Sequence, residues 1–393
     1  MKRVLQVESY SASDPWTDQS TRVFRDTLNQ SGLGINYEIF PFGVRFQPGM
    51  NPCAGDIRAL QAKLDSHPYD LIVVYNNDAA DLFLDGQLKL PAGTPLLLES
   101  YHGEPPRELK RKLSMTAVLA ARHPYESVKL GLQLLPDTRN IVMLVDATAD
   151  GHRQRELLGE IPEEITRKIS IIDGVEYSTS EMMEKVGKLP PHTLLIFHSW
   201  GSSRDETPAN SYTTLSRIRR LFPGMILGRY DTYMQLGSDG GSVAIGAESG
   251  KQTGKLALRI LNGENAALIP YEYLRTHARL DYGAIRKYGI PATRIPTGTQ
   301  IMNTPPDFLT RYRLELATGG GVLFLVLAGF LAVSSYRRRE HRKAAVLFNS
   351  LPLRIFIFDR QGRILHVHIP DPVAGMVDNS LKHLDEIPSP EVR

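Results

Sequence analysis

The stretch "VLQVESYSASDPWTDQSTRVFRDTL", from Val4 to Leu28, contains an apolar strand, a polar turn and an amphipathic helix in direct succession. Apolar and β-branched residues cluster from Val4 to Tyr10, and Pro15 with the nearby Asp18 indicates a helix start. The turn therefore lies at the carboxyl end of a strand, where open α/β sheets bind their ligands. From this turn we predict three ligand-contacting residues: Ser9, Tyr10 and Trp16.

Strand-like runs alternate with helical patterns over the next two hundred residues, which predicts βαβ units and mostly parallel sheets. The first set of expected strands comprises Val4 to Tyr10, Ile35 to Pro41, Leu71 to Tyr75 and Pro95 to Tyr101. The second set comprises Asn140 to Val145, Lys168 to Asp173, Thr193 to His198 and Met225 to Tyr230. Expected helices include Tyr125 to Leu135, Leu215 to Leu221 and Gly250 to Leu261. Two α/β sets of similar size predict two lobes.

The lobes are expected to be joined by several chain crossings, which would form a hinged cleft. We place the first crossing at Pro105 and Pro106, and we expect the strand-like segment Glu272 to Asp281 to return to the first lobe. The expected first lobe is then about 1–105 with 262–290, and the second is about 115–260.

Composition limits the class of protein. The chain has 393 residues, 42% of them hydrophobic and 23% charged, which fits two or three folded units. The net charge of +3 is small, and five basic residues fall within "RRREHRK" (Arg337 to Lys343), so a basic nucleic-acid-binding face is not expected. The single cysteine, Cys53, excludes an intrachain disulfide and a multi-cysteine metal site. We expect no cofactor, no bound metal and no nucleic-acid partner.

The segment "LATGGGVLFLVLAGFLAVSSY" (Leu316 to Tyr336) carries no charge and predicts a transmembrane helix. About twenty residues at about 1.5 Å each span roughly 30 Å, the thickness of the hydrocarbon core of a bilayer. The basic cluster that follows places the carboxyl side in the cytoplasm and residues 1–310 outside it. The start "MKRVLQVESY" is not a signal peptide. We therefore expect either a missing upstream signal or anchor, or translocation driven by the span itself.

Several segments resemble, in the same order, the ABC-transporter-type substrate-binding domain of bacterial membrane sensor histidine kinases and related signalling proteins. They are "SYSASDPWT", "YDLIVVYNNDAADLFL", "LLPDTRNIVMLVDATADG", "GGSVAIGAESGKQTGKLALRILNGE" and "LDYGAIRKYGIPATRIPTGTQIMNTPPDFLTRYR". The resemblance covers about 310 residues. It implies an α/β fold of the two-lobe periplasmic-binding-protein type, with two Rossmann-like parallel sheets that close around a small molecule.

Residues 337–393 are expected to form a cytoplasmic juxtamembrane segment and a truncated domain. In "AAVLFNSLPLRIFIFDRQGRILHVH" (Ala344 to His368) we predict a short helix and two strands around a turn at Asp359 to Gly362. This order resembles the α+β opening of a PAS domain, and a generic hairpin is the alternative. An output domain, such as a kinase or a cyclase, would lie beyond Arg393.

The sequence contains no complete catalytic motif. "GAESGKQTGK" (Gly246 to Lys255) lacks the spacing and the hydroxyl of a phosphate loop and is interpreted as a helix start. Ser199 lacks a nucleophile elbow, and the pair His366 and His368 lacks a third metal ligand. A hydrolase using Ser199, His198 and Asp146 would need those groups within hydrogen-bond reach. We therefore predict no enzyme activity in this chain.

Strand ends in both predicted lobes supply the candidate ligand-binding residues. They are Ser9, Tyr10, Trp16, Asn77, Asp78, Tyr101 and His102 from the first lobe and Asp146, His198, Trp200, Tyr230 and Asp231 from the second. The aromatic members suit a sugar, an amino acid or another small metabolite. Asn77 and Asp78 are alternatively the cap of the helix that follows.

The function predicted from these features is small-molecule sensing by a single-pass protein of the bacterial inner membrane, with its amino-terminal domain outside the cytoplasm. Ligand-induced closure of the lobes would signal through the membrane helix, and a homodimer through the membrane and cytoplasmic parts is expected. The alternative is a membrane-anchored solute-binding protein that serves an ABC transporter.

Overall fold

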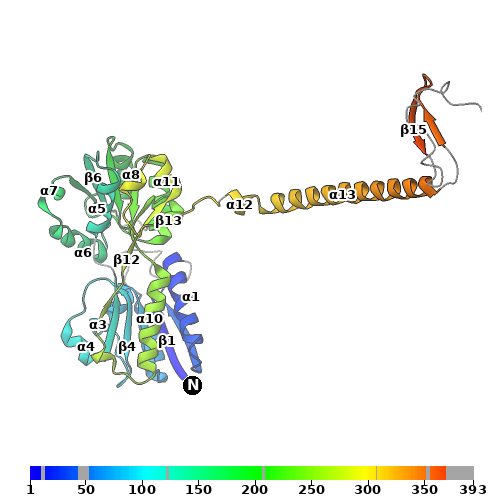
Figure 1. Cartoon of the computed structure of the whole chain (residues 1–393). Helices are drawn as coiled ribbons and strands as arrows, with labels where there is room; N and C mark the ends of the chain where they lie inside the picture. The colour runs from blue at the N-terminus through cyan, green and yellow to red at the C-terminus, as the bar shows by residue number, and fades with distance from the viewer. Residues whose placement is uncertain are drawn as a thin grey trace, which may run out of the picture. The chain divides into compact units, whose positions relative to one another are not determined.

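The computed structural model describes residues 1–9, 14–42, 53–120, 124–205, 209–306, 308–350 and 355–368. The chain forms two compact units, Met1–Thr304 and Pro305–Arg393, which are described separately. Figure 1 shows unit 1 as two α/β lobes and unit 2 as a long helix followed by a hairpin.

The first lobe is built on a six-stranded sheet in the order β11-β5-β4-β3-β1-β2, in which every pairing is parallel. Its strands are β1 (Lys2–Glu8), β2 (Ile35–Pro41), β3 (Leu71–Tyr75), β4 (Leu96–Tyr101), β5 (Met115–Leu119) and β11 (Glu272–Tyr273). Its helices are α1 (Pro15–Asn29), α2 (Ala54–Ser66), α3 (Asn77–Leu84), α4 (Arg107–Lys112), α10 (Gly246–Leu261) and the 3₁₀ turn η4 (Ala266–Leu268). Every residue of β3, β4 and β5 is buried, because helices cover both faces of the sheet.

Helices α1 and α10 lie side by side on one face of this sheet (Figure 1). Helix α1 begins at Pro15 because the Asp14 carboxylate accepts a hydrogen bond from the Thr17 backbone N–H at 2.8 Å. Helix α10 approaches α1 closely through Gly250, where a Cβ would lie 2.1 Å from the Ser20 carbonyl oxygen. The glycine-rich segment "GAESGKQTGK" is therefore a helix start, as predicted, and its second glycine serves helix packing.

The second lobe is built on a seven-stranded sheet in the order β13-β12-β10-β9-β8-β6-β7, which is parallel except for the pair β10 and β12. Its strands are β6 (Asn140–Val145), β7 (Ile169–Asp173), β8 (Thr193–Phe197), β9 (Ile226–Gly228), β10 (Gly240–Ala244), β12 (Thr276–Asp281) and β13 (Gln300–Met302). Its helices are α5 (Pro124–Leu134), α6 (Ala149–Leu157), α7 (Glu163–Thr166), α8 (Thr179–Gly187), α9 (Ser211–Leu221) and α11 (Tyr282–Lys287). Three 3₁₀ turns complete it: η2 (Leu158–Glu160), η3 (Asp231–Leu236) and η5 (Ala292–Arg294).

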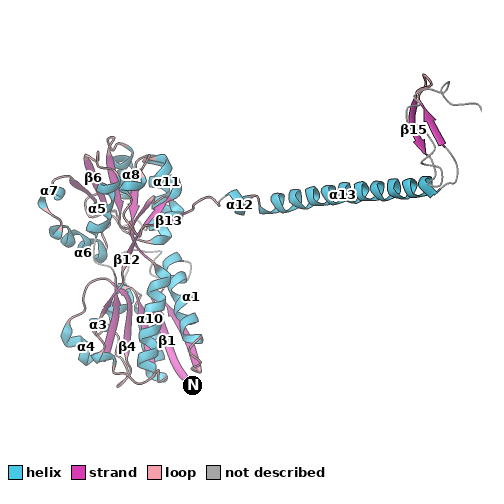
Figure 2. Ribbon diagram, in the orientation of Figure 1, coloured by secondary structure: helices cyan, strands magenta, loops and turns pink. Residues whose placement is uncertain are grey.

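The chain passes between the lobes three times: between β5 and α5, between β10 and α10, and between β11 and β12 (Figure 2). The first crossing was expected at Pro105 and Pro106, and that boundary is wrong because β5 still pairs with β4 in the first sheet. The predicted range 115–260 for the second lobe wrongly included α10, which packs on α1. The predicted return of 262–290 to the first lobe is wrong for β12 and α11, because β12 pairs with β10 in the second sheet.

Unit 2 contains α12 (Phe308–Arg311), α13 (Arg313–Ser350), β14 (Ile355–Phe358) and β15 (Ile364–His368). Among the described residues, α13 is the one helix that is long and apolar enough to cross a membrane, with a mean hydropathy of 2.2 in its most apolar window. Strands β14 and β15 form the predicted antiparallel hairpin. The Asp359 carboxylate accepts bonds from the backbone N–H groups of Gln361 and Arg363 at 2.8 and 2.9 Å, and Gly362 adopts a φ of 83°. The described residues of unit 2 thus show a hairpin, and no further strand of a PAS sheet.

Candidate functional site

Side chains from both lobes meet around the carboxylate of Asp150, near the amino-terminal end of α6. We call His102, Asp150, His198, Arg229 and Tyr230 the interlobe cluster. The carboxylate contacts the first lobe through His102 Nδ1, and it lies 3.1 Å from Arg229 Nη1 and 3.4 Å from His198 Nε2 in the second lobe. The Tyr230 hydroxyl lies 3.3 Å from His102 Nε2. The cluster therefore links the end of β4 to the ends of β8 and β9.

The contacts assign protons within the cluster. Arg229 Nη1 can only donate, so the His198 Nε2 atom that it contacts is an acceptor and His198 is neutral. Burial, followed by the charge of Arg229, lowers the pKa of His198 to about 4. Burial also lowers the pKa of His102, because the effect of burial outweighs the opposing effect of the Asp150 charge. At neutral pH both imidazoles are therefore uncharged.

Asp150 and Arg229 carry the charge of the cluster. Burial by itself raises the pKa of Asp150, but the neighbouring His102 and Arg229 outweigh it and hold that pKa well below its ordinary value. The pKa of Arg229 is raised by Tyr230 and Asp150 against the effect of burial. The cluster thus contains one carboxylate and one guanidinium in direct contact.

A second set of contacts joins the lobes beside the cluster. The Trp16 ring of α1 packs on the Tyr230 ring at 4.6 Å between centroids. The Asp231 carboxylate accepts a bond from Gln19 Nε2 in the first lobe at 3.4 Å and lies 3.3 Å from Arg279 Nη1 in the second. Burial is the largest influence on Asp231 and raises its pKa. Tyr230 and Asp231, both predicted from the sequence, thus lie at the boundary between the lobes.

Four of the residues predicted to contact ligand have structural contacts within the first lobe. The Ser9 hydroxyl donates to the Tyr75 carbonyl at 2.7 Å and accepts from the Ala79 N–H at 2.9 Å, so Ser9 caps α3. The Asn77 side chain bonds both backbone groups of His102, at 2.8 and 3.0 Å. Tyr101 is nearly buried, with its hydroxyl bonded to Asp81 at 2.9 Å. Trp16 is 4% exposed and belongs to the first-lobe core.

Two of the second-lobe predictions likewise lie among protein groups. The Asp146 carboxylate accepts bonds from the Gly201 N–H at 2.9 Å and from the Thr148 N–H at 3.1 Å, which fixes the turn before α6. Trp200 is fully buried and donates from Nε1 to the Thr179 hydroxyl at 3.1 Å.

Asp78 is exposed in the first turn of α3. Tyr10 lies outside the described residues.

The possible hydrolase triad is not assembled in the described part of the chain. Asp146 bonds backbone groups, while His198 contacts Asp150 and Arg229. The Ser199 hydroxyl is buried and has no hydrogen-bond partner among the described residues. No nucleophile is therefore activated at this position.

Asp150, Arg229 and Arg153, all at the boundary between the lobes, were not predicted from the sequence. Asp150 and Arg153 belong to the polar sequence "ADGHRQREL", which is typical of an exposed helix. Arg229 was placed inside the predicted strand Met225 to Tyr230, but β9 already ends at Gly228. The position of Asp150 one residue inside a helix that follows a buried strand was the signal available.

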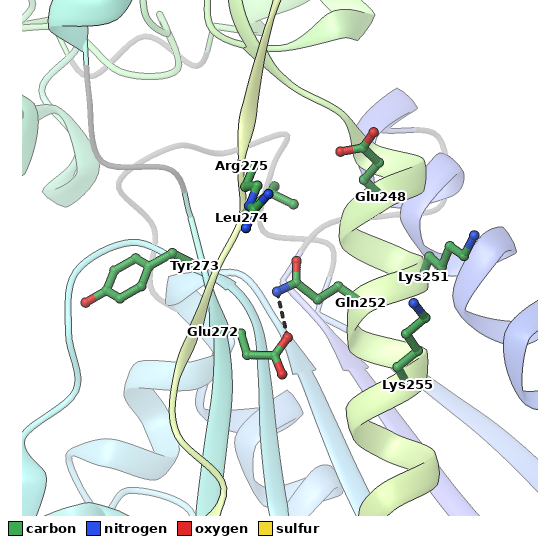
Figure 3. A pocket seen from close by; sticks show the side chains of 8 residues that line it. All are labelled: Glu248, Lys251, Gln252, Lys255, Glu272, Tyr273, Leu274 and Arg275. Atoms are coloured by element: carbon green, nitrogen blue, oxygen red, sulfur yellow. Dashed lines mark hydrogen bonds between the residues drawn. The ribbon is translucent and has the colours of Figure 1, made fainter.

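A separate hollow of 320 Å³ lies between α10 and the third crossing (Figure 3). It is lined by Glu248, Lys251, Gln252, Lys255, Glu272, Tyr273, Leu274 and Arg275. Both glutamates have partners, since Gln252 Nε2 donates to Glu272 at 2.7 Å and His277 contacts Glu248 at 2.7 Å. The hollow is open, and it shares no residue with the interlobe cluster.

Comparison with known proteins identifies the fold. No protein-family model and no curated protein matches the chain. A ligand-free, open substrate-binding protein with adhesive properties from Clostridium difficile matches with a TM-score of 0.56 and 12% identity, over 78% of this chain and 100% of that one. An ABC domain in complex with L-Trp from Streptococcus pneumonia matches with a TM-score of 0.58 and 15% identity, over 77% and 99%. A conserved domain protein from Vibrio cholerae matches with a TM-score of 0.56 and 14% identity, over 76% and 99%.

These similarities define the class of fold. Unit 1 has the two-lobe α/β fold of periplasmic substrate-binding proteins, as the resemblance in the sequence implied. The interlobe cluster lies where the carboxyl ends of β4, β8 and β9 face one another in that fold.

Proposed function

We propose that unit 1 binds a small molecule between its lobes, outside the cytoplasm, and that the chain is a membrane receptor. The observation that carries this proposal is the interlobe cluster, in which His102 of the first lobe contacts Asp150 of the second. Polar side chains that converge at strand ends from two lobes are the usual composition of a ligand site in α/β proteins. Binding without chemistry fits the cluster because Asp150 and Arg229 satisfy one another.

The binding step is tested by thermal unfolding of the full chain against amino acids, sugars and organic acids. Both tryptophans, Trp16 and Trp200, lie in unit 1, so intrinsic fluorescence reports on that unit. A ligand present at a hundred times its dissociation constant stabilises its domain by about 2.7 kcal/mol. A library that produces no stabilisation contradicts the proposal.

Movement of the lobes is measured with one native and one introduced label. Cys53 is exposed in the first lobe and is the chain's single cysteine, and Lys188 is exposed in the second. In the Lys188→Cys variant, spin labels at both positions should come closer when ligand is added. The control pair, Cys53 with Arg22→Cys, lies within the first lobe and should not change. Equal separations with and without ligand contradict closure.

Signalling is favoured over delivery to a permease because α13 continues past the apolar segment to Ser350 and is followed by the hairpin. In liposomes, a label at Arg342→Cys in a Cys53→Ser background reports the distance between two protomers of a homodimer. We expect that distance to change with ligand. A ligand-independent distance, with binding intact, favours the solute-delivery alternative.

Membrane orientation is tested separately with reporter fusions. A reporter after Lys343 should be cytoplasmic, and a reporter before Arg311 should not be. The reverse pattern contradicts a receptor with an external ligand domain.

A further inference from the structure

Arg153 extends from α6 of the second lobe to the first lobe. A Cβ placed on Gly103, which has a φ of 104° and directly follows His102, would lie 3.5 Å from Arg153 Cδ. The charge of Arg153 also acts on Asp81 and Tyr101 of the first lobe, where it lowers their pKa values against the dominant effect of burial. The guanidinium therefore lies at the boundary between the lobes, beside the interlobe cluster.

The Nε and Nη2 atoms of Arg153 are both buried, and neither has a hydrogen-bond partner among the described residues. These two nitrogens form one edge of the guanidinium, and their N–H bonds point in the same direction. That edge donates two parallel hydrogen bonds to a carboxylate or a phosphate. A buried donor without an acceptor is costly, so an unused pair at a lobe boundary indicates a missing acceptor.

Neighbouring arginines already have such acceptors. Arg229 Nη1 lies 3.1 Å from Asp150, and Arg155 Nη1 lies 2.8 Å from Asp173. Arg153 has no carboxylate within ion-pair distance in the described part of the chain. Its interaction with Asp81 is a longer-range electrostatic one.

We propose that Arg153 binds an oxyanion group of the ligand through its Nε and Nη2 edge, so that the ligand is a small carboxylate or phosphate compound. This inference rests on the proposed function and narrows its ligand class. Neutral sugars are then excluded as the main ligand.

The first experiment measures binding to the full chain with matched probes. The carboxylate arm pairs amino acids and dicarboxylic acids with their primary amides, and the phosphate arm pairs sugar phosphates with the free sugars. We expect either the carboxylic acids or the sugar phosphates to stabilise the protein against unfolding, and their neutral partners to have no effect. The set that stabilises the protein shows whether the oxyanion is a carboxylate or a phosphate. Arg153→Gln should weaken binding of that acid at least about tenfold, since two charge-assisted bonds are lost. The control Arg167→Gln, in an exposed pair with Glu163, should bind normally.

The second measurement needs no ligand. If the edge is unpaired in the free protein, Arg153→Met removes buried unsatisfied donors and should raise the melting temperature of unit 1 by about 2–4 °C. A fall of similar size would show that Arg153 has a structural partner and would overturn the inference. Tight binding of a neutral probe that Arg153→Gln leaves unchanged would also overturn it, while the proposed function would stand. Failure of every probe to stabilise the wild-type chain counts against the proposed function, and the inference fails with it.

Discussion

Two carboxylates, the fully buried Glu99 of the first lobe and the partly buried Asp150 of the cluster, differ in what surrounds them. Glu99 ends the apolar run of β4 and accepts bonds from two hydroxyls, Ser20 on α1 and Ser249 on α10. Burial raises its pKa to about 7, and the charge of Glu8 adds to that effect. Asp150 has an arginine and two histidines around it, and its pKa is held well below the ordinary value. Burial alone therefore does not set the protonation state; the charge of the partners does.

The largest expected effect follows from removing the charge of Asp150. Asp150→Asn leaves Arg229 buried without a counter-charge and should lower the free energy of unfolding of unit 1 by about 3–5 kcal/mol. Denaturant unfolding of the full chain, followed by tryptophan fluorescence, measures this change. The control Asp18→Asn breaks an exposed pair with Arg22 and should cost less than about 1 kcal/mol. Equal losses of stability in the two variants would show that Asp150 and its partners contribute no more than an exposed ion pair.

The next effect concerns Glu99 and depends on pH. Its pKa rises from 4.5 in the unfolded chain to about 7 in the folded one, so the folded state binds the extra proton in this range. Stability is then fully present below about pH 4.5 and falls as the pH rises towards 7, by about 3 kcal/mol in total. Glu99→Gln should remove this fall: at pH 8 the variant should be more stable than the wild type, and at pH 4 the two should be equal. A variant that is less stable at pH 8 would show that Glu99 is ionised and well solvated.

The smallest effect isolates one hydroxyl of the cluster. Tyr230→Phe removes the bond to His102 and keeps the ring that packs on Trp16, so it should cost about 1 kcal/mol. It should also increase the distance between labels at Cys53 and Lys188→Cys in the free protein. Tyr101→Phe removes a hydroxyl bond to Asp81 inside one lobe and should leave that distance unchanged. The same response from both variants would mean that the Tyr230 hydroxyl does not hold the lobes together.

Most of the parallel strands could be predicted because a buried parallel strand is an apolar run between polar turns, although β5 was missed and the order of the strands within each sheet was not predicted. Ile35–Pro41, Leu71–Tyr75 and Asn140–Val145 have the predicted bounds. The strand β10, "GGSVA", was missed because glycine weakens the strand pattern. Lobe membership was misjudged because no local feature of β5 or α10 encodes which sheet they join.

The candidate site was predictable in part. His102, His198, Tyr230 and Asp231 were predicted because they follow strands, and the structure places them at the boundary between the lobes. Trp16 and Trp200 follow the same rule, yet they pack into cores, because sequence position does not give the direction of a side chain. Arg153 and Arg229 are recognisable only from contacts between segments far apart in the chain, whereas the position of Asp150 at a helix start was a signal in the sequence.

The three crossings between the lobes have a consequence for biosynthesis. The first lobe begins with β1, but it needs α10 and β11, which are translated only after most of the second lobe. Until residue 273 has emerged, the apolar face of α1 that packs on α10 is uncovered, and β5 is an open sheet edge. Such long-range closure slows folding and prolongs the exposure of apolar surface. The first lobe therefore stays incomplete, with apolar surface exposed, during most of the synthesis of unit 1.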